Sequence, residues 1–151
     1  MRDCRHILKY CAVDPNKVHY APTRHYGGDA GFDLTCTEQT LILPGDFGRV
    51  STNIRVALPQ RTWGFLVGRS STFLKRNLIV NPGIIDNGWR GELMAVVYNP
   101  TKEAAVISEG DRIIQLIIFN LLDVGTVQVE SGDFPDGERG ENGFGSTGGH
   151  V

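Results

Sequence analysis

Short apolar runs recur along the chain, separated by Gly, Pro, Asn or Asp, and several have a hydrophobic side chain at every second position. In one run Ile54, Val56 and Leu58 alternate with Arg55 and Ala57, the period of a strand with one buried face. Runs that predict strands are 6–10, 32–36, 40–44, 48–59, 62–68, 92–99, 104–108, 112–119 and 125–130. About ten short strands bounded by turn residues predict an all-β fold, a jelly-roll-like β-barrel or sandwich.

One segment, SSTFLKRN (70–77), predicts a short helix with Ser70 or Ser71 as its N-cap. Composition changes after residue 130, because seven of the last 21 residues are Gly and few could enter a core. We therefore expect a β-barrel domain over residues 1–130 and a flexible, Gly-rich C-terminal arm over residues 131–151. The arm contains GFGSTG (143–148), a G-x-G-x-x-G pattern, but three following residues leave no room for the helix of a dinucleotide site.

Charge and composition exclude several classes of function. A net charge of −2 over 151 residues gives no basis for a nucleic-acid polymer as partner. No apolar run reaches the roughly 18 residues of a membrane helix, and no targeting signal is evident. We therefore expect no membrane partner and a location in the cytoplasm, or inside a host cell. Cys4, Cys11 and Cys36 form no C-x-x-C pair and predict free thiols, and the four His show no zinc-ligand spacing.

Polar clusters interrupt the predicted strands. DAGFDL (29–34), which contains Asp33, is either an ordinary turn into a strand or part of a site. GRSST (68–72) places Arg69, Ser70 and Ser71 where a strand gives way to a helix. Hydroxyls and backbone N–H groups there form an anion site, or no more than a capped helix beside a solvated Arg.

Two further polar clusters lie later in the chain, at 81–89 and 110–115. In NPGIIDNGW (81–89), Asn87-Gly88 predicts a two-residue hairpin, and Asp86 is either the first residue of its turn or a partly desolvated base beside Trp89. GDRIIQ (110–115) carries Arg112 at a strand entry. With the Arg, Phe and hydroxyl residues of the arm, these groups are suited to a nucleoside polyphosphate, because guanidinium forks match phosphate and an aromatic face covers a base.

In this order the stretches DAGFDL, GRSST, GIIDNGWRGE, GDRIIQLI and RGENGFGSTG resemble the five motifs of the trimeric dUTPase family, from about Tyr20 to Gly148. The resemblance implies a jelly-roll homotrimer with three active sites, each shared between subunits. It also implies Mg²⁺-dependent hydrolysis of dUTP to dUMP and pyrophosphate by attack of water on the α-phosphorus. That activity keeps uracil out of DNA and supplies dUMP for dTMP synthesis.

The resemblance also implies roles for individual residues. Asp86 would activate the attacking water, Asp33 would steer Mg²⁺ through water, and Arg112 would be structural or linked to the trimer. Trp89 stands where the family usually has a Tyr against the deoxyribose, and Phe144 would stack on uracil. The full set of predicted substrate-binding residues is Arg69, Ser70, Ser71, Asn81, Gly83, Ile85, Trp89, Gln115, Arg139, Phe144, Gly145, Ser146 and Thr147.

Two alternatives stay open. NPGIIDNGW also resembles the dCTP deaminases, which share the fold, so one alternative is a dCTP deaminase or a bifunctional deaminase and dUTPase. Those enzymes carry a catalytic Glu two residues before a Tyr-Asn pair, and here Val96 stands at that place before Tyr98-Asn99. The other alternative is a non-enzymatic module that binds nucleotide or a protein. Asp86 and the complete arm argue against it.

Overall fold

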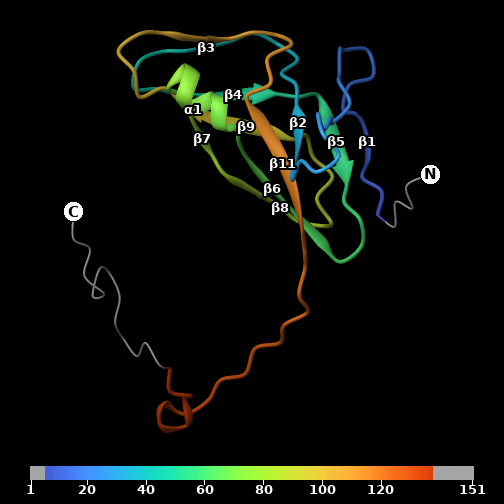
Figure 1. Ribbon diagram of the computed structural model, residues 1–151, viewed down its shortest axis with the longest axis vertical. Coiled ribbons are helices and arrows are strands. Elements are labelled where there is room, and N and C mark those ends of the chain that lie inside the picture. The colour runs from blue at the N-terminus through green and yellow to red at the C-terminus, as the bar shows by residue number, and fades with distance from the viewer. Residues whose placement is uncertain (1–5, 138–151) are drawn as a thin grey trace.

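The structure, a computed structural model, describes residues 6–137. Within them the chain forms strands joined by short loops and turns, with one α-helix (Figure 1). The strands are β1 (Lys9–Ala12), β2 (Gly31–Leu34), β3 (Thr40–Ile42), β4 (Phe47–Ser51), β5 (Ile54–Ala57), β6 (Thr62–Gly68), β7 (Ile79–Asn81), β8 (Gly83–Ile85), β9 (Met94–Tyr98), β10 (Ala105–Ile107) and β11 (Ile114–Asn120). The helix α1 (Ser70–Arg76) follows β6, and a 3₁₀ turn spans Ser131–Asp133.

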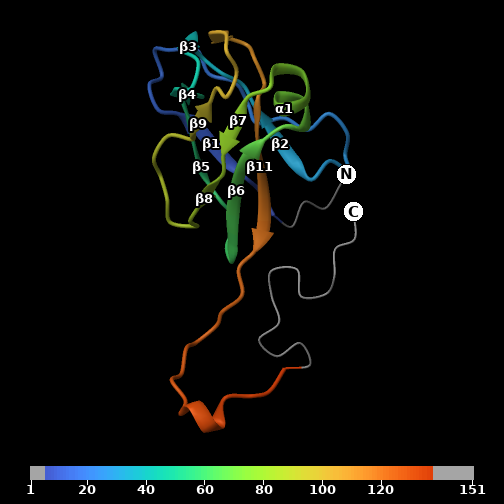
Figure 2. The same ribbon diagram turned by 90° about the vertical axis from the view of Figure 1, so that its left-hand side faces the viewer.

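All strand pairs are antiparallel. The largest sheet has the order β2-β11-β6-β8, and a second has the order β4-β9-β7. Two smaller sheets pair β1 with β5 and β10 with β3. None of these sheets closes into a barrel, and they pack into one body seen from two sides in Figures 1 and 2. The predicted all-β, jelly-roll-like fold with one short helix is confirmed.

The core lies between the sheets. Ile54 and Val56 are buried on β5 while Arg55 between them is exposed, as the alternation predicts. The same alternation continues on β9, where Ala95 and Val97 are buried between exposed neighbours. Burying the apolar face of each strand stabilises the folded state by about 25 cal/mol for each Å² of apolar surface removed from water. This burial holds the sheets together.

Helix α1 begins differently from the prediction. Its N-cap is Arg69 in an extended conformation, with no side-chain capping bond, so the prediction of Ser70 or Ser71 as N-cap is wrong. Both serines lie inside the first turn because β6 continues directly into the helix. The helix ends at Asn77 in the left-handed region (φ 54°), and the Asn77 N–H donates to the Phe73 carbonyl at 2.9 Å. This αL cap suits Asn, which tolerates positive φ.

The predicted strand 125–130 is wrong for the single chain. After β11 the chain leaves the body at Leu121 and runs away from it (Figure 1), and residues 121–137 are exposed. A strand needs a neighbour for its backbone hydrogen bonds, and none of the described strands pairs with this segment. The arm predicted from residue 131 stays a prediction, and residues 138–151 lie outside the described part of the chain.

Among residues 6–137, no helix has the length and hydrophobicity needed to cross a membrane. Within the described residues Cys11, which is exposed, and Cys36, which is buried, are free thiols; Cys4, the third cysteine of that prediction, lies outside them. Burial raises the pKa of the Cys36 thiol from its ordinary value of 9.0 to about 11, and the nearby Asp111 carboxylate adds to the shift. Cys36 is therefore a packing residue at neutral pH, since the reactive form of cysteine is the thiolate.

Candidate active site

Two arginines converge on one carboxylate at the end of the largest sheet. The Arg69 Nε lies 2.9 Å from Asp33 Oδ1, and the Arg112 guanidinium lies 3.6 Å from Asp33 Oδ2. The Arg69 guanidinium also donates to the Arg112 carbonyl at 2.8 Å. Three residues far apart in the sequence thus form one cluster with an excess of one positive charge. Such a cluster is suited to bind an anion.

Gln115 belongs to the same cluster. It lies opposite Asp33 on β2 and Val67 on β6, and its Nε2 donates to the Gly68 carbonyl at 3.2 Å. The side chain occupies the space above Gly31, because a Cβ built there would lie 3.0 Å from Gln115 Cδ and would overlap the amide oxygen. Glycine at position 31 therefore leaves room for Gln115 at the site.

Ser70 and Ser71 start helix α1 directly after Arg69, where Ser70 is exposed and Ser71 is half-buried. The structure thus brings the predicted residues Asp33, Arg69, Gln115 and the two serines to one end of the sheet. With Arg112 at the same place, we call this group the arginine cluster.

Asp86 lies on a turn after β8. The Trp89 N–H donates to the Asp86 carbonyl at 3.0 Å, which confirms a turn around Asn87-Gly88. The predicted hairpin is wrong, because β8 pairs with β6 while β9 pairs with β4 and β7. Neither Asn87 nor Gly88 has positive φ. The tight hairpin turn typical of Asn-Gly needs positive φ at both residues, so the chain turns without pairing its two flanks.

The side chain of Asn87 fixes this turn to the body. Its Nδ2 donates to the Pro59 carbonyl at 2.7 Å and to the Thr62 carbonyl at 2.8 Å, next to the start of β6. The sequence analysis took Asn87 only as a turn former. The signal that it missed is that an Asn side chain beside a buried strand can also satisfy carbonyls of a distant loop.

Asp86 lines an open cavity of about 430 Å³. The lining residues are Arg49, Ile84, Ile85, Asp86, Trp89, Glu92, Met94 and Val96. Asp86 itself is exposed, so in the single chain the predicted desolvation of this carboxylate is absent. The Trp89 ring lies over Gly91, where a Cβ would meet the ring carbons at 2.7–2.8 Å, and the side chain is half exposed.

The other residues predicted from this region lie beside the same cavity. Asn81 ends β7 opposite Val96, so the two side chains share a face. Gly83 pairs with Leu66 at the start of β8, and a Cβ there would make only an ordinary contact at 3.7 Å. The Ile85 side chain is 8% exposed and joins the core, so only its backbone is free for a ligand.

The arginine cluster and Asp86 are separated within one chain. Gln115 lies opposite Val67 on β6, whereas Ile85 lies opposite Gly64. Asp86 follows Ile85, so it is about 10–13 Å from Gln115 along the strands and about 10 Å across the sheet. No single small group bound at the cluster can touch both. Predicted site residues Arg139, Phe144, Gly145, Ser146 and Thr147 lie outside the described residues.

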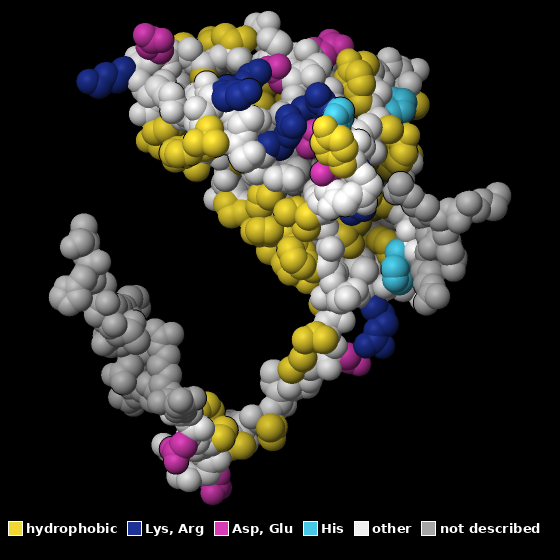
Figure 3. All heavy atoms as spheres, viewed as in Figure 1, with side chains coloured by type: hydrophobic (Ala, Val, Ile, Leu, Met, Phe, Trp, Pro, Cys, Tyr) yellow, Lys and Arg dark blue, Asp and Glu magenta, His cyan; other side chains and the backbone are white. Residues whose placement is uncertain are grey.

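Apolar side chains that are not fully buried form two groups. On the largest sheet Phe119 is exposed and Trp63, Phe65 and Ile117 are half-buried, with the Trp63 and Phe119 rings stacked at 4.9 Å. We call this the β6–β11 surface. Figure 3 shows hydrophobic side chains gathered on the body near the point where the chain leaves β11. A second group, the β9 surface, comprises Phe47, Met94, Val96 and Tyr98, which are 38–68% exposed. Exposed apolar patches of this kind mark interaction sites.

No group of three or more His, Cys, Asp or Glu side chains suited to hold a metal ion is found in residues 6–137. Both carboxylate oxygens of Asp33 already face guanidinium groups. Mg²⁺ commonly keeps several waters and takes its other ligands from substrate phosphates. The residues at the cluster therefore fit an outer contact through water to a phosphate-bound Mg²⁺, and they do not fit a site built from protein ligands alone.

Comparison with known proteins agrees with this geometry. The dUTPase family model matches residues 18–148, so the chain belongs to the dUTPase family, which comprises hydrolases of nucleotide metabolism. The deoxyuridine 5'-triphosphate nucleotidohydrolase of Tropheryma whipplei (strain Twist) is 39% identical over 137 residues, covering 89% of this chain and 92% of the relative. That of Nocardia farcinica is 42% identical over 133 residues, covering 86% and 79%. The predicted family is confirmed.

Solved structures give the same result. The Staphylococcus bacteriophage 80alpha dUTPase with dUpNHpp has a TM-score of 0.85 and 28% identity, covering 94% of this chain and 98% of that one. A dUTPase from phage phi11 of S. aureus, described with a structural Mg(II) ion, has a TM-score of 0.76 and 25% identity, covering 85% and 99%. The dCTP deaminase alternative finds no support among these relatives.

Proposed function

We propose that this protein hydrolyses dUTP to dUMP and pyrophosphate, with Mg²⁺ bound to the triphosphate. The observation that supports it best is the convergence of Arg69 and Arg112 on Asp33 beside Gln115, at the positions of three motifs of the family. Guanidinium groups bind phosphate oxygens with two parallel hydrogen bonds, and each charge-assisted bond contributes about 1.5–3 kcal/mol.

In this proposal Asp33 has two roles. It holds the side chains of the two arginines in place, and it would accept hydrogen bonds from water bound to Mg²⁺. The metal would neutralise charge on the phosphates and so make the α-phosphorus open to attack. Gln115, Ser70 and Ser71 would supply further donors to the phosphate oxygens.

Asp86 would take a proton from the attacking water. Because it lies far from the arginine cluster of its own chain, we propose that each active site combines the cluster of one copy with Asp86 of another. The two different apolar surfaces favour this arrangement, since a head-to-tail contact joins unlike patches and forms a ring when the rotation between copies closes. The family resemblance makes that ring a homotrimer. Burial by the neighbouring copy would then desolvate Asp86 and Trp89.

The segment after β11 supports the same assembly. Val124, Val127 and Val129 are 44–85% exposed and have no partner strand among the described elements. We propose that this segment pairs with a neighbouring copy and so delivers the C-terminal residues to a site there. Arg139, Phe144, Gly145, Ser146 and Thr147 would close over the nucleotide, with Phe144 on the uracil ring. A cytoplasmic location stays a prediction.

The test is pyrophosphate release from dUTP, dCTP, dTTP and UTP, with Mg²⁺ and with EDTA. We expect release from dUTP with Mg²⁺ and far slower release from the other three nucleotides. Ammonia release from dCTP would favour the deaminase, and no turnover of any nucleotide would favour a binding module.

A further inference from the structure

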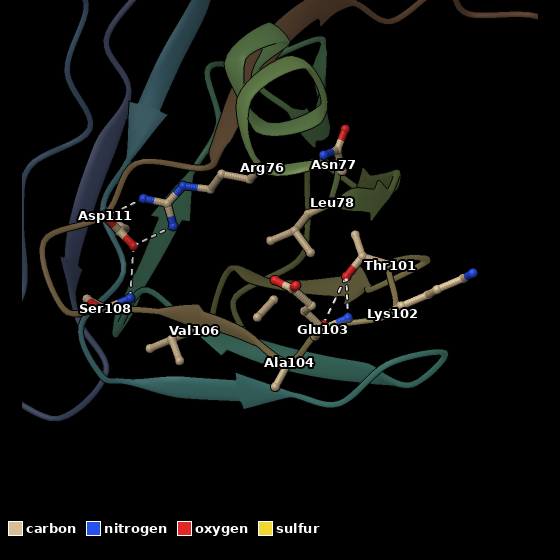
Figure 4. A pocket seen from close by; sticks show the side chains of 11 residues that line it. Arg76, Asn77, Leu78, Thr101, Lys102, Glu103, Ala104, Val106, Ser108 and Asp111 are labelled. Atoms are coloured by element: carbon tan, nitrogen blue, oxygen red, sulfur yellow. Dashed lines mark hydrogen bonds and ion pairs between the residues drawn. The ribbon is translucent and has the colours of Figure 1, made fainter.

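Outside the arginine cluster, Arg76 and Asp111 form an ion pair with two parallel hydrogen bonds, which we call the clamp. The Arg76 guanidinium, at the last residue of α1, donates two hydrogen bonds to the carboxylate of Asp111 at 2.7 and 2.8 Å (Figure 4). The same carboxylate accepts the Ser108 N–H at 2.9 Å, which fixes its orientation. The Arg76 side chain is 38% exposed and that of Asp111 23%, and both face an open groove of about 640 Å³.

The clamp is one of several bonds between α1 and the segment 111–113. At the start of the helix the Arg69 N–H donates to the Ile113 carbonyl at 3.0 Å. One turn later the Thr72 hydroxyl donates to the same carbonyl at 2.6 Å. Arg76 then holds the far end of the helix. One face of α1 is therefore bonded, at its start, middle and end, to the short segment that carries Arg112.

This arrangement links the two arginines of the site. Arg69 is fixed by the start of α1, and Arg112 lies in the segment to which α1 is bound. Their guanidinium groups can converge on Asp33 only while helix and segment keep their relative position. Without the clamp, the bonds between α1 and this segment come from the N-terminal half of the helix alone, and the C-terminal end is anchored by the buried Leu78 but no longer to the segment.

We propose that Arg76 and Asp111 are positioning residues, which set the spacing of the phosphate-binding groups Arg69 and Arg112. The inference rests on the proposed function, since it assigns these arginines to phosphate. A forked, two-bond pair fixes direction as well as distance, which a single point charge does not. A displacement of about 1 Å in a site can cost a factor of about 10² in rate.

The clamp persists at neutral pH. The hydrogen bonds from Arg76 hold the pKa of the Asp111 carboxyl below its ordinary value, and Asp111 in turn raises the pKa of Arg76. Because both groups are partly exposed, such a pair contributes little to overall stability. Positioning therefore predicts a loss of anion affinity without a matching loss of stability, whereas a merely structural role predicts the reverse.

The test measures binding of inorganic tripolyphosphate by calorimetry, the dUTP kcat and KM, and Tm, for Arg76→Gln, Arg76→Lys and Asp111→Asn. Lys75→Gln is the matched control, since it removes the same charge from the adjacent residue of the same helical turn. We expect Arg76→Gln and Asp111→Asn to weaken tripolyphosphate binding and raise KM by about 10-fold or more, with the Tm close to that of the control. Arg76→Lys, which keeps the charge and loses the fork, should fall between.

Coupling to the site gives a further readout. In an Arg69→Ala background, Arg76→Gln should have little additional effect on tripolyphosphate binding, because the residue that it positions is gone. Equal affinities of Arg76→Gln and Lys75→Gln, or a wild-type affinity for Arg76→Lys, would overturn the proposal. If the wild-type protein bound tripolyphosphate with this mutational pattern yet did not hydrolyse dUTP, the positioning role would stand and the proposed reaction would fail.

Discussion

Replacing Gly31 with Ala should disable the site through Gln115 without unfolding the protein. The added Cβ would lie 3.0 Å from Gln115 Cδ and 3.2 Å from its Cβ, closer than side chains normally approach. The Gln115 side chain must rotate away, and its hydrogen bond to the Gly68 carbonyl is lost. That bond contributes about 0.5–1.5 kcal/mol. Ala has a lower backbone entropy than Gly in the unfolded chain and so loses less on folding, which offsets about 0.5–1 kcal/mol of this loss.

The net change in stability is thus within about 1 kcal/mol, or a few degrees in Tm. The functional loss is larger, because a hydrogen bond to a charged phosphate contributes about 1.5–3 kcal/mol. We therefore expect kcat/KM for dUTP to fall about 10- to 150-fold. The assay is initial-rate pyrophosphate release with a parallel thermal melt.

Gly28→Ala is the control, since a Cβ at that glycine meets no atom within 4 Å and its φ is not positive. In a Gln115→Ala background, Gly31→Ala should change kcat/KM no further. The reasoning is refuted if Gly31→Ala matches Gly28→Ala, or if it costs as much activity in the Gln115→Ala background as in the wild type.

Three further predictions follow from the site and the core. Asp86→Asn should bind dUTP nearly as well as the wild type and lose about 10²–10⁴ in kcat; near-normal turnover would exclude it as the base. Trp89→Ala should raise UTP hydrolysis relative to dUTP, because the ring bounds the cavity beside Asp86; an unchanged ratio of the two kcat/KM values would reduce Trp89 to packing. Because folding raises the pKa of Cys36 from 9.0 to about 11, the stabilisation from the neutral thiol is complete below pH 9 and lost as pH rises through 11. The free energy of unfolding of the wild type relative to Cys36→Ala should therefore fall by roughly 2 kcal/mol between pH 9 and 11, and a flat difference would contradict it.

Hydrophobic patterning predicted most of the strands that find partners within the chain, but no predicted run covers β7 (Ile79–Asn81) or β8 (Gly83–Ile85). Ile54 and Val56 are buried as the period of two requires, and the same holds for β9. The pattern failed at 125–130, which has a comparable alternation and no partner strand among the described residues. Alternation encodes which face is apolar, but it carries no information on what will cover that face.

Short sequence motifs predicted turns correctly, but they did not predict the contacts between residues that are far apart in the sequence. Asn87-Gly88 does form a turn, yet the flanking strands pair elsewhere, since pairing depends on backbone φ and on competing strands. The approach of Asp33, Arg69 and Arg112 could not be read from residue spacing, because the three lie on β2, next to α1 and before β11. Only the family resemblance pointed to their common site. The clamp between Arg76 and Asp111 had no sequence signal.

Mixing two inactive variants tests whether each active site joins two copies of the chain. Asp86→Asn keeps the arginine cluster, and Arg69→Ala keeps Asp86. If copies assort at random, half of the sites receive a functional Asp86 and half of those also receive a functional Arg69. Co-refolded equimolar mixtures should then recover about a quarter of wild-type dUTP turnover, while each variant alone stays inactive. Mixed oligomers, verified by mass, that recover no activity would show that the cluster and Asp86 do not form a shared site.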